Sequence, residues 1–418
     1  MGRGCEPLRS LLPHAPIRQG SPGGKCHRRF IRGSLIPVIM SKRAFAGLVI
    51  IETMLAFANT FAASFNVIYM FNELDMPIWS GPIYLGLGFG ISILVSLWMS
   101  RRPHLDPRNA MIFGLACLTV EYSLFLFVTD GWILALSVGV AFGLFYPFFW
   151  TPFNVLMAQM TDKNDRGVKY GVFFFIWPLV TFIAPLLGGL LIRSAGYNAL
   201  FAVGIGIVAS TAVMIVAYRN YIPKDQVMRI RPEAIGRRNT IATLGEGGFE
   251  GVFWIGVTLV AYEFSQDEVS LGALFSLFGL SAGLMAIILG KVSDRIQNRI
   301  FFLRASALAS IPCIVLVYLS GSLEEYAVAN GILEFACFAL PVFVFVILTD
   351  KLEETKNDSV LTREYLLDIG RVASIAVMMT LLYYGFSARE CFLLCIPFLL
   401  MTAAAHEMKK PASSVPGR

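Results

Sequence analysis

The stretch Phe173-Phe-Phe-Ile-Trp-Pro-Leu-Val-Thr-Phe-Ile-Ala-Pro-Leu-Leu-Gly-Gly-Leu-Leu-Ile192 decides the fold, because it is apolar on every face of a helix. About twenty helical residues span about 30 Å, the thickness of the hydrocarbon core of a bilayer. A strand of a membrane barrel would instead alternate apolar and polar residues. The stretch therefore predicts a membrane-spanning helix.

Similar stretches recur along the chain, in which 56% of the 418 residues are hydrophobic and 15% are charged. A soluble domain has roughly a quarter charged residues and could not bury this much apolar surface. The expected fold class is therefore an all-α membrane protein with twelve transmembrane helices in two six-helix halves. The predicted spans are 45–71, 79–99, 110–129, 132–157, 171–192, 197–217, 240–264, 269–290, 300–320, 326–349, 364–386 and 390–407.

The segments between these spans define the expected domains. Residues 1–39 are rich in Gly, Pro and Arg and lack a signal-peptide pattern, so they predict a disordered tail or a wrongly assigned start. The expected order continues with an N-terminal half (40–218), a cytoplasmic linker (219–239), a C-terminal half (240–408) and a cytoplasmic tail (409–418).

The net charge of +6 does not predict nucleic-acid binding, because the basic residues are not gathered in one patch. Most of them fall in the two tails and in alternate loops, as the positive-inside rule requires. We therefore expect a multi-pass protein of the inner or plasma membrane, with both termini in the cytoplasm.

Neither a metal nor a cofactor is expected. The seven cysteines show no zinc or disulfide spacing, and the four histidines lie in or next to aqueous segments. Gly279-Leu-Ser281-Ala-Gly283 matches a hydrolase motif, but it lies within a predicted span and has no histidine beside it. The missing histidine argues against a catalytic site, so we expect no enzyme. No Walker lysine motif is present, so we expect no ATP-driven pump.

The loop after the eighth span reads Gly290-Lys-Val-Ser-Asp294-Arg295-Ile-Gln-Asn-Arg299. It resembles the G-x-x-x-D-R-x-x-R loop of the major facilitator superfamily of transporters. The resemblance covers about residues 40–408 and implies a gate made by Gly290, Asp294, Arg295 and Arg299. The corresponding first-half loop, Ser100 to Arg108, keeps basic residues but not this pattern.

A second motif lies in the fifth span. Ala184-Pro185-Leu-Leu-Gly188-Gly189 resembles the G-P-x-x-G-G motif of antiporters in this family, with Ala in place of the first Gly. Pro185, Gly188 and Gly189 are therefore expected to bend the helix. An Arg four residues before a Gly in the fourth span, typical of drug exporters, is absent, since Gly139 precedes Gly143.

Polar residues at membrane depth are costly and indicate function. They form a polar face on each of three predicted spans, and the family resemblance implies that these spans line a central cavity. The residues are Glu52, Asn59 and Asn66 in the first span, Tyr146, Trp150 and Asn154 in the fourth, and Asn330 and Glu334 in the tenth.

The seventh span contains Gly245-Glu246-Gly-Gly-Phe-Glu250-Gly-Val-Phe-Trp254. Glu246 and Glu250 lie one turn apart, and two carboxylates in a poorly hydrated cavity do not easily both ionise. They predict a proton site, and Trp254 follows them into the same cavity. The glycines are expected to weaken the helix, as in the broken helices of transporters.

Two further charged groups lie in the eleventh span. Asp368 and Arg371 are expected to form a salt bridge of the gate near the cytoplasmic end, with Arg371 as an alternative site for an anionic substrate. Glu121 in the third span has no predicted role.

These features predict a secondary transporter that moves a small solute by alternating access and couples it to protons, with export by antiport slightly favoured. Proton-coupled uptake stays open, and so does a transporter-like receptor or scaffold that does not transport. The expected partners are a small-molecule substrate, protons and the lipid bilayer, and the expected state is a monomer.

The twelve-span topology predicts which loops face which side. In a cysteine-free background, Asn72→Cys and Ser265→Cys should react with an impermeant thiol reagent on intact cells, because both lie in predicted outer loops. Asn164→Cys and Asn357→Cys should react only after permeabilisation. Labelling of Asn164→Cys from outside would contradict the topology.

Overall fold

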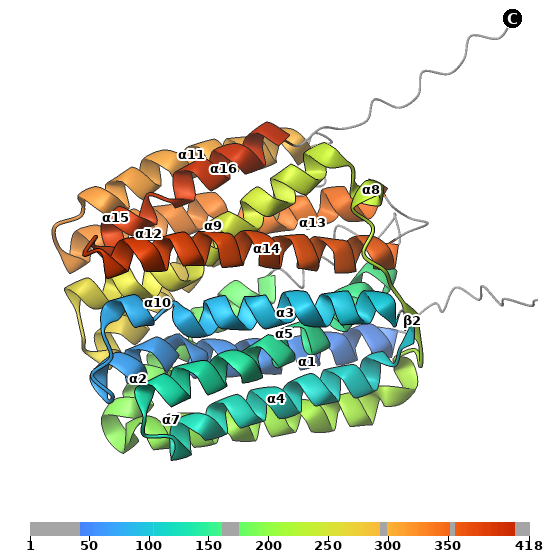
Figure 1. Cartoon of the computed structure of the whole chain (residues 1–418), viewed down its shortest axis with the longest axis horizontal. Coiled ribbons are helices and arrows are strands. Elements are labelled where there is room, and N and C mark those ends of the chain that lie inside the picture. The colour runs from blue at the N-terminus through green and yellow to red at the C-terminus, as the bar shows by residue number, and fades with distance from the viewer. Residues whose placement is uncertain (1–41, 103, 161–174, 293–298, 352–355, 406–418) are drawn as a thin grey trace, which may run out of the picture. The chain divides into compact units, whose positions relative to one another are not determined.

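The computed structural model describes residues 42–102, 104–160, 175–292, 299–351 and 356–405. Almost all of these residues are helical, and the long helices run roughly along one direction (Figure 1). The described region is a bundle whose first half ends with α7 and whose second half begins with α9.

The first half begins with a span in three parts and ends with two spans joined at a kink. Gly196 has a φ of 79° inside α7, a value that favours glycine, and it separates the fifth span from the sixth. A helical stretch at 175–181 precedes α7. The elements are α1 (Lys42–Phe61), η1 (Ala63–Phe65), α2 (Asn66–Asn72), η2 (Ile78–Ser80), α3 (Ile83–Arg101), β1 (His104–Leu105), α4 (Pro107–Phe127), α5 (Gly131–Met160) and α7 (Ala184–Tyr218).

The linker contains η3 (Arg219–Tyr221), β2 (Gln226–Val227) and α8 (Pro232–Ile235). β2 pairs antiparallel with β1, His104 opposite Val227. The second half then follows with α9 (Arg237–Phe264), α10 (Glu268–Val292), α11 (Arg299–Leu319), α12 (Leu323–Cys337), α13 (Ala339–Lys351), α14 (Lys356–Tyr383), α15 (Ala388–Phe392) and α16 (Cys395–Ala405).

Twelve spans account for these helices. Within the described residues, nine stretches are long and apolar enough to cross a membrane, and one of them, Phe175–Tyr221, holds two spans because of the turn at Gly196. The remaining two spans are α9, which carries several charged residues, and the short pair α15 and α16. The predicted fold class is confirmed.

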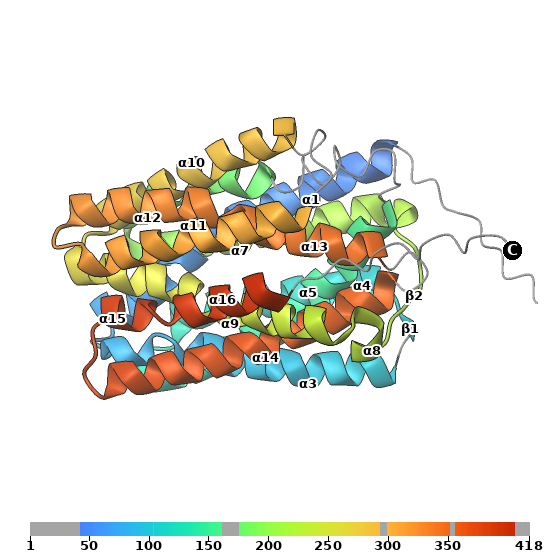
Figure 2. The same cartoon turned by 90° about the horizontal axis from the view of Figure 1, so that it is seen from above.

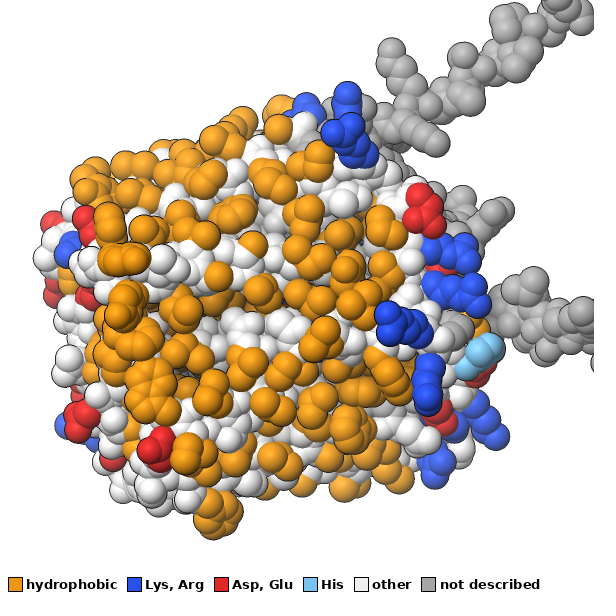
Figure 3. Space-filling model, viewed as in Figure 1, with side chains coloured by type: hydrophobic (Ala, Val, Ile, Leu, Met, Phe, Trp, Pro, Cys, Tyr) orange, Lys and Arg blue, Asp and Glu red, His pale blue; other side chains and the backbone are white. Residues whose placement is uncertain are grey.

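The outer surface suits a bilayer. Hydrophobic side chains cover the middle of the face in Figure 3. Large apolar side chains of the described helices are exposed, and Phe127 at the end of α4 is 81% exposed. Lys and Arg side chains gather at one end, near α8 and β2. We call this the basic end, and α1 begins and α16 ends there (Figure 1).

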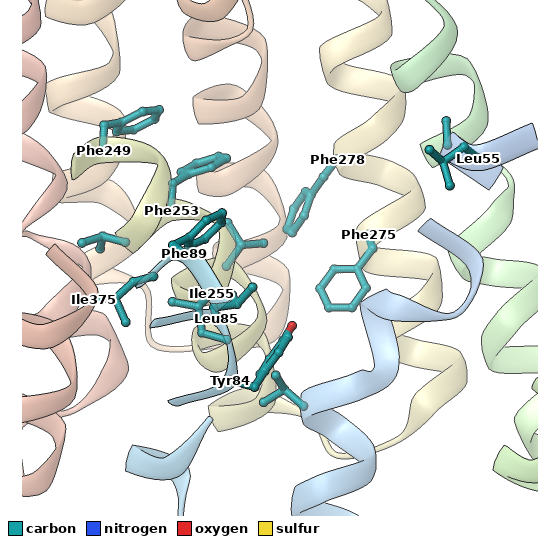
Figure 4. Packing of buried hydrophobic residues seen from close by; sticks show 14 of the residues in the cluster. Leu55, Tyr84, Leu85, Phe89, Phe249, Phe253, Ile255, Phe275, Phe278 and Ile375 are labelled. Atoms are coloured by element: carbon teal, nitrogen blue, oxygen red, sulfur yellow. The ribbon is translucent and has the colours of Figure 1, made fainter. Parts of the chain in front are cut away.

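The two halves meet along two helix pairs. α3 lies beside α14, as Figure 2 also shows, and α7 packs against α10. Figure 4 shows Leu85 and Phe89 of α3 next to Ile255 of α9 and Ile375 of α14. Buried apolar side chains therefore form one core that continues from the first half into the second.

The Pro185 motif lies at the second of these contacts. The chain leaves helical geometry at 182–183, and the backbone N–H of Leu186 donates to Ser276 Oγ of α10 at 3.2 Å. A Cβ on Gly189 or Gly188 would collide with the carbonyl oxygens of Glu268 and Phe61. The break thus lies just before the motif, Pro185 stands in the first turn of α7, and Gly188 and Gly189 lie within the helix, where they let α7 approach α1 and α10 closely.

Two sequence expectations need correction. α14 begins at Lys356, eight residues before the predicted start at 364, because its polar first turns continue the helix beyond the apolar stretch. The first span is not one regular helix, because the 3-10 turn η1 lies between Asn59 and Asn66. The two asparagines therefore do not share the face that an uninterrupted helix would give them.

The close packing of α7 against α10 predicts that adding a methyl group at Gly272 lowers the stability of the protein. A Cβ on Gly272 would lie 2.5 Å from the Pro185 carbonyl oxygen, whereas a Cβ on Gly206 meets nothing within 4 Å. Gly272→Ala should lower the melting temperature of the purified protein, since overpacking costs about 1–3 kcal/mol. Gly206→Ala is the matched control and should be neutral. Equal melting temperatures for the two variants would show that α7 and α10 are not closely packed.

Candidate functional site

Six charged side chains meet where α9 and α14 pack against each other. Because Glu246 and Glu250 are one turn apart, they share a face of α9. α14 supplies the rest at positions 363, 364, 368 and 371, which also recur at helical spacing. All six are buried, with exposures of 8% or less. We call Glu246, Glu250, Arg363, Glu364, Asp368 and Arg371 the buried charge cluster.

Arg371 links two acids. Its Nε donates to Glu250 Oε2 at 3.0 Å, and its Nη1 donates to Asp368 Oδ1 at 2.7 Å. The other oxygen of Asp368 accepts from Ser92 Oγ of α3 at 2.5 Å. This hydrogen bond joins the second half of the chain to the first.

Three aromatic rings surround the same guanidinium group. Its Cζ lies 4.9 Å from the ring centre of Phe89, 5.3 Å from that of Tyr146 and 4.7 Å from that of Trp254. These rings come from α3, α5 and α9, and the attraction of a cation to an aromatic face helps to replace lost hydration. Arg371 is therefore held in place from both halves.

Arg363 organises the other part of the cluster. Its Nη2 donates to Glu246 Oε1 at 2.6 Å, and its Nη1 donates to Glu364 Oε1 at 3.0 Å. Asn154 Nδ2 of α5 also donates to Glu364 Oε1, at 3.3 Å. The second oxygen of Glu246 is buried and has no hydrogen-bond partner among the described residues.

The charges of the cluster do not cancel. Four carboxyl groups face two guanidinium groups, so the fully ionised cluster carries two excess negative charges. Uncompensated charge is expensive in a poorly hydrated interior. The arrangement therefore favours binding of further positive charge, either protons on the carboxyl groups or a cation.

A cavity of about 160 Å³ adjoins the cluster, enclosed by α9, α12, α13 and α16. Four predicted cavity residues line it: Glu246, Glu250, Trp254 and Glu334. Aromatic rings form much of the remaining wall. They belong to Phe249, Phe253 and Phe338.

The glycines of α9 do not break the helix, contrary to the sequence expectation. α9 runs unbroken from Arg237 to Phe264. A Cβ on Gly247 would collide with the Leu367 carbonyl of α14, and one on Gly251 would lie 2.8 Å from Arg371 Cα. The glycines therefore bring the two helices close enough for Glu246 and Glu250 to reach the arginines.

Several predicted residues lie away from the cluster. Asn66 Nδ2 donates to Glu121 Oε1 at 3.1 Å, which gives Glu121 a partner within the first half. Glu52 and Asn330 are buried, and both side-chain polar atoms of Asn330 lack a partner among the described residues. Asn59 is partly buried, and Trp150 packs against Trp177 with ring centres 5.8 Å apart.

The predicted gate loop lies largely outside the described residues. Asp294 and Arg295 fall in that gap, while Gly290 is near the end of α10 and Arg299 begins α11. Asp368 and Arg371 were expected near the cytoplasmic end of their helix, but they lie near the middle of α14 because that helix starts earlier.

Sequence reasoning missed Arg363, Glu364 and Ser92. Arg363 and Glu364 lie at the limit of the predicted eleventh span, where basic and acidic residues suggest a loop. One signal was available, since Glu364, Asp368 and Arg371 follow the i, i+4, i+7 spacing of a single helix face.

Comparison with known proteins agrees with this architecture. Residues 48–238 match the family model of the Major Facilitator Superfamily. The chain is also 22% identical over 258 residues to the uncharacterized protein YqgE of Bacillus subtilis (strain 168), a match that covers 57% of this chain and 59% of that relative. The chain thus spans little more than half the length of this curated relative.

Solved structures share the fold over most of the chain. The human organic anion transporter MFSD10 (TETRAN) matches with a TM-score of 0.59 and 14% identity, covering 88% of this chain and 99% of that one. The E. coli fucose:proton symporter FucP gives 0.62 and 13%, covering 87% and 98%. A POT family transporter in complex with 5-aminolevulinic acid gives 0.66 and 11%, covering 87% and 95%. The predicted resemblance to the superfamily is confirmed.

The pairing of Arg363 with Glu246 predicts how the site responds when one partner is lost. Arg363→Met leaves Glu246 and Glu364 without their cation, and breaking a buried pair from one side costs about 3–5 kcal/mol. The melting temperature should fall, and Glu246→Gln in the same chain should restore part of it. Arg101→Met removes an exposed charge and serves as the control. A double variant no more stable than Arg363→Met alone would contradict the pairing.

Proposed function

We propose that this chain, which has the family signature and the fold of the major facilitator secondary transporters, moves a small solute across a membrane in exchange with or together with protons. The family match over residues 48–238 and the shared fold support secondary transport in general. The proton coupling and the location of the site are the proposal. The observation that supports them is the buried charge cluster, with its excess of carboxyl groups.

The buried charge cluster contacts both halves of the chain, so the relative movement of the halves in alternating access would change its surroundings. In transporters of this architecture the halves rock against each other around a site near the middle of the bilayer. Asp368 and Glu364 lie on the second half and accept hydrogen bonds from Ser92 and Asn154 of the first. Relative movement of the halves would break these two bonds, so the protonation of the acids and the position of the halves are linked.

A proton would act by releasing an arginine. When Glu250 is ionised it holds Arg371, and a proton on its carboxyl group removes that charge. Arg371 then keeps only Asp368 as an ionic partner. Glu246 has an oxygen that no described residue contacts by a hydrogen bond, so a proton can bind there without breaking one of the hydrogen bonds described above. Proton binding can therefore change the partners of Arg371 and Arg363 without unfolding the site.

Both export and uptake of the solute are compatible with this proposal. The motif at Pro185 slightly favours export by antiport, whereas one protein of the same fold is described as a fucose:proton symporter. A binding protein that does not transport would have little need of hydrogen bonds that break when the halves move. The basic end is placed in the cytoplasm by the positive-inside rule, with a monomer as the working unit.

Proton coupling can be tested with purified protein in liposomes that contain a pH-sensitive dye. A panel of solutes is added outside, and a substrate of the parent is recognised by the proton movement that it causes. Glu250→Gln and Glu246→Gln should abolish proton movement and accumulation, since a fixed neutral side chain cannot exchange a proton. Both variants should keep exchange of labelled for unlabelled solute, which needs no net proton movement.

Glu324→Gln provides the control, because Glu324 is an exposed acid at the start of α12. It should behave like the parent in both assays. Accumulation at the parental level in Glu246→Gln, Glu250→Gln and the double variant would refute coupling at these residues and direct the search to Glu52 or Glu334.

A further inference from the structure

We infer that the substrate carries an organic cation, an amine or quaternary ammonium group, which binds beside Glu334 in the aromatic cavity next to the cluster. This inference rests on the proposed transport function and adds the chemical class of the solute. It depends on the composition of the cavity wall and on the state of the charges around it.

The wall contains one acid that no described basic residue pairs with, and a second acid, paired with Arg363, whose other oxygen has no described hydrogen-bond partner. Glu334 of α12 lines the cavity, and no basic side chain pairs with it in the described part of the chain. Glu246 is 2% exposed, lines the same cavity and has an oxygen without a hydrogen-bond partner among the described residues. A cationic group between them would gain two acceptors that no donor of the described residues uses.

The rest of the wall suits the apolar surface of such a cation. Phe249, Phe253, Trp254 and Phe338 line the cavity. Aromatic faces attract cations, and they bind alkylated ammonium groups in other proteins. Aromatic rings and carboxylates together favour a cation over a neutral sugar-like solute, because few neutral hydrogen-bonding side chains line the cavity.

An anionic substrate fits the same site poorly. Arg371 is held by Glu250 and Asp368 and covered by three aromatic rings, and Arg363 is held by Glu246 and Glu364. Both guanidinium groups are therefore already paired with acids, and of their nitrogens only Arg363 Nε lacks a hydrogen-bond partner among the described residues. With Glu334 included, the acids outnumber the arginines by five to two, so an anion would meet net repulsion.

The size of the cavity sets what enters it in this conformation. A volume of about 160 Å³ is below the range of about 300–1,000 Å³ typical of pockets for drug-sized ligands. It accommodates a single head group rather than a whole large molecule. The remainder of a larger solute would extend out of the cavity toward the interface of the halves.

Protons and an organic cation would compete for the same acids. A cation beside Glu334 and Glu246 neutralises the charge that a proton would otherwise neutralise. Exchange of one for the other is the simplest arrangement for antiport. Binding of the cation should therefore weaken as the pH falls.

The test uses matched probes of equal shape and different charge on the detergent-purified protein. Choline is compared with neutral 3,3-dimethylbutan-1-ol and anionic 3,3-dimethylbutanoate, and 2-phenylethylammonium with 3-phenylpropanoate. Binding is followed by calorimetry, and in the parent also by tryptophan fluorescence, to which Trp254 of the cavity wall contributes along with the other five tryptophans. At least one cation should bind, more weakly at pH 6 than at pH 8, and at least tenfold more tightly than its neutral or anionic counterpart.

Variants locate the site. Glu334→Gln should weaken cation binding at least tenfold, and Trp254→Phe should preserve it better than Trp254→Leu because a ring remains. Glu324→Gln should leave it unchanged. Tighter binding of an anionic probe, failure of both cations to bind, or full binding in Glu334→Gln would each overturn the inference.

The binding assay in detergent and the proton-movement assay in liposomes together separate this inference from the proposed function. If an anionic or neutral solute drives proton movement that depends on Glu250, proton-coupled transport stands and the cation inference is wrong. If the cations bind through Glu334 but their movement is independent of protons, the cation inference stands and the coupling proposal is wrong.

Discussion

The need to neutralise charge inside a bilayer constrains this structure more than any other factor. Arg363 and Arg371 could not remain in the interior without the acids that face them, and these acids lie partly on another helix. α9 and α14 must therefore touch along their length. The small residues Gly247 and Gly251 on α9, and Gly370 on α14, allow that approach. Helix packing, glycine placement and the position of the site thus share one electrostatic origin.

The contact between α9 and α14 also explains why the two halves of the chain are joined at the buried charge cluster. Asp368 Oδ2, and the Glu364 oxygen that already accepts from Arg363, accept further hydrogen bonds from Ser92 and Asn154 of the first half. The rings of Phe89 and Tyr146 complete the surroundings of Arg371 from the same side. Each half thus satisfies polar groups of the other. The interface is consequently specific in this conformation, and two hydrogen bonds of the cluster, from Ser92 and Asn154, cross it.

Most of the fold could be predicted from the sequence, because bilayer thickness alone sets the length of an apolar helix. The site was predicted in part, since Glu246, Glu250, Trp254 and Glu334 were recognised as polar or aromatic groups at membrane depth. Arg363 was not predicted, because a span predicted from hydropathy starts after the charged residues, whereas α14 includes them and begins at Lys356. The pairing of Asn66 with Glu121 could not be foreseen, because it depends on the 3-10 turn that rotates the end of the first span.

The polarity of α9 has a consequence for how the chain is made. The insertion machinery transfers segments into lipid according to their hydrophobicity, and α9 is outside the set of described helices apolar enough to insert alone. Its glutamates gain their cationic partners only when α14 emerges, more than a hundred residues later in synthesis. We expect α9 to wait at the edge of the translocation channel until that helix arrives. Biogenesis of the second half would then be a cooperative step and a natural point for quality control.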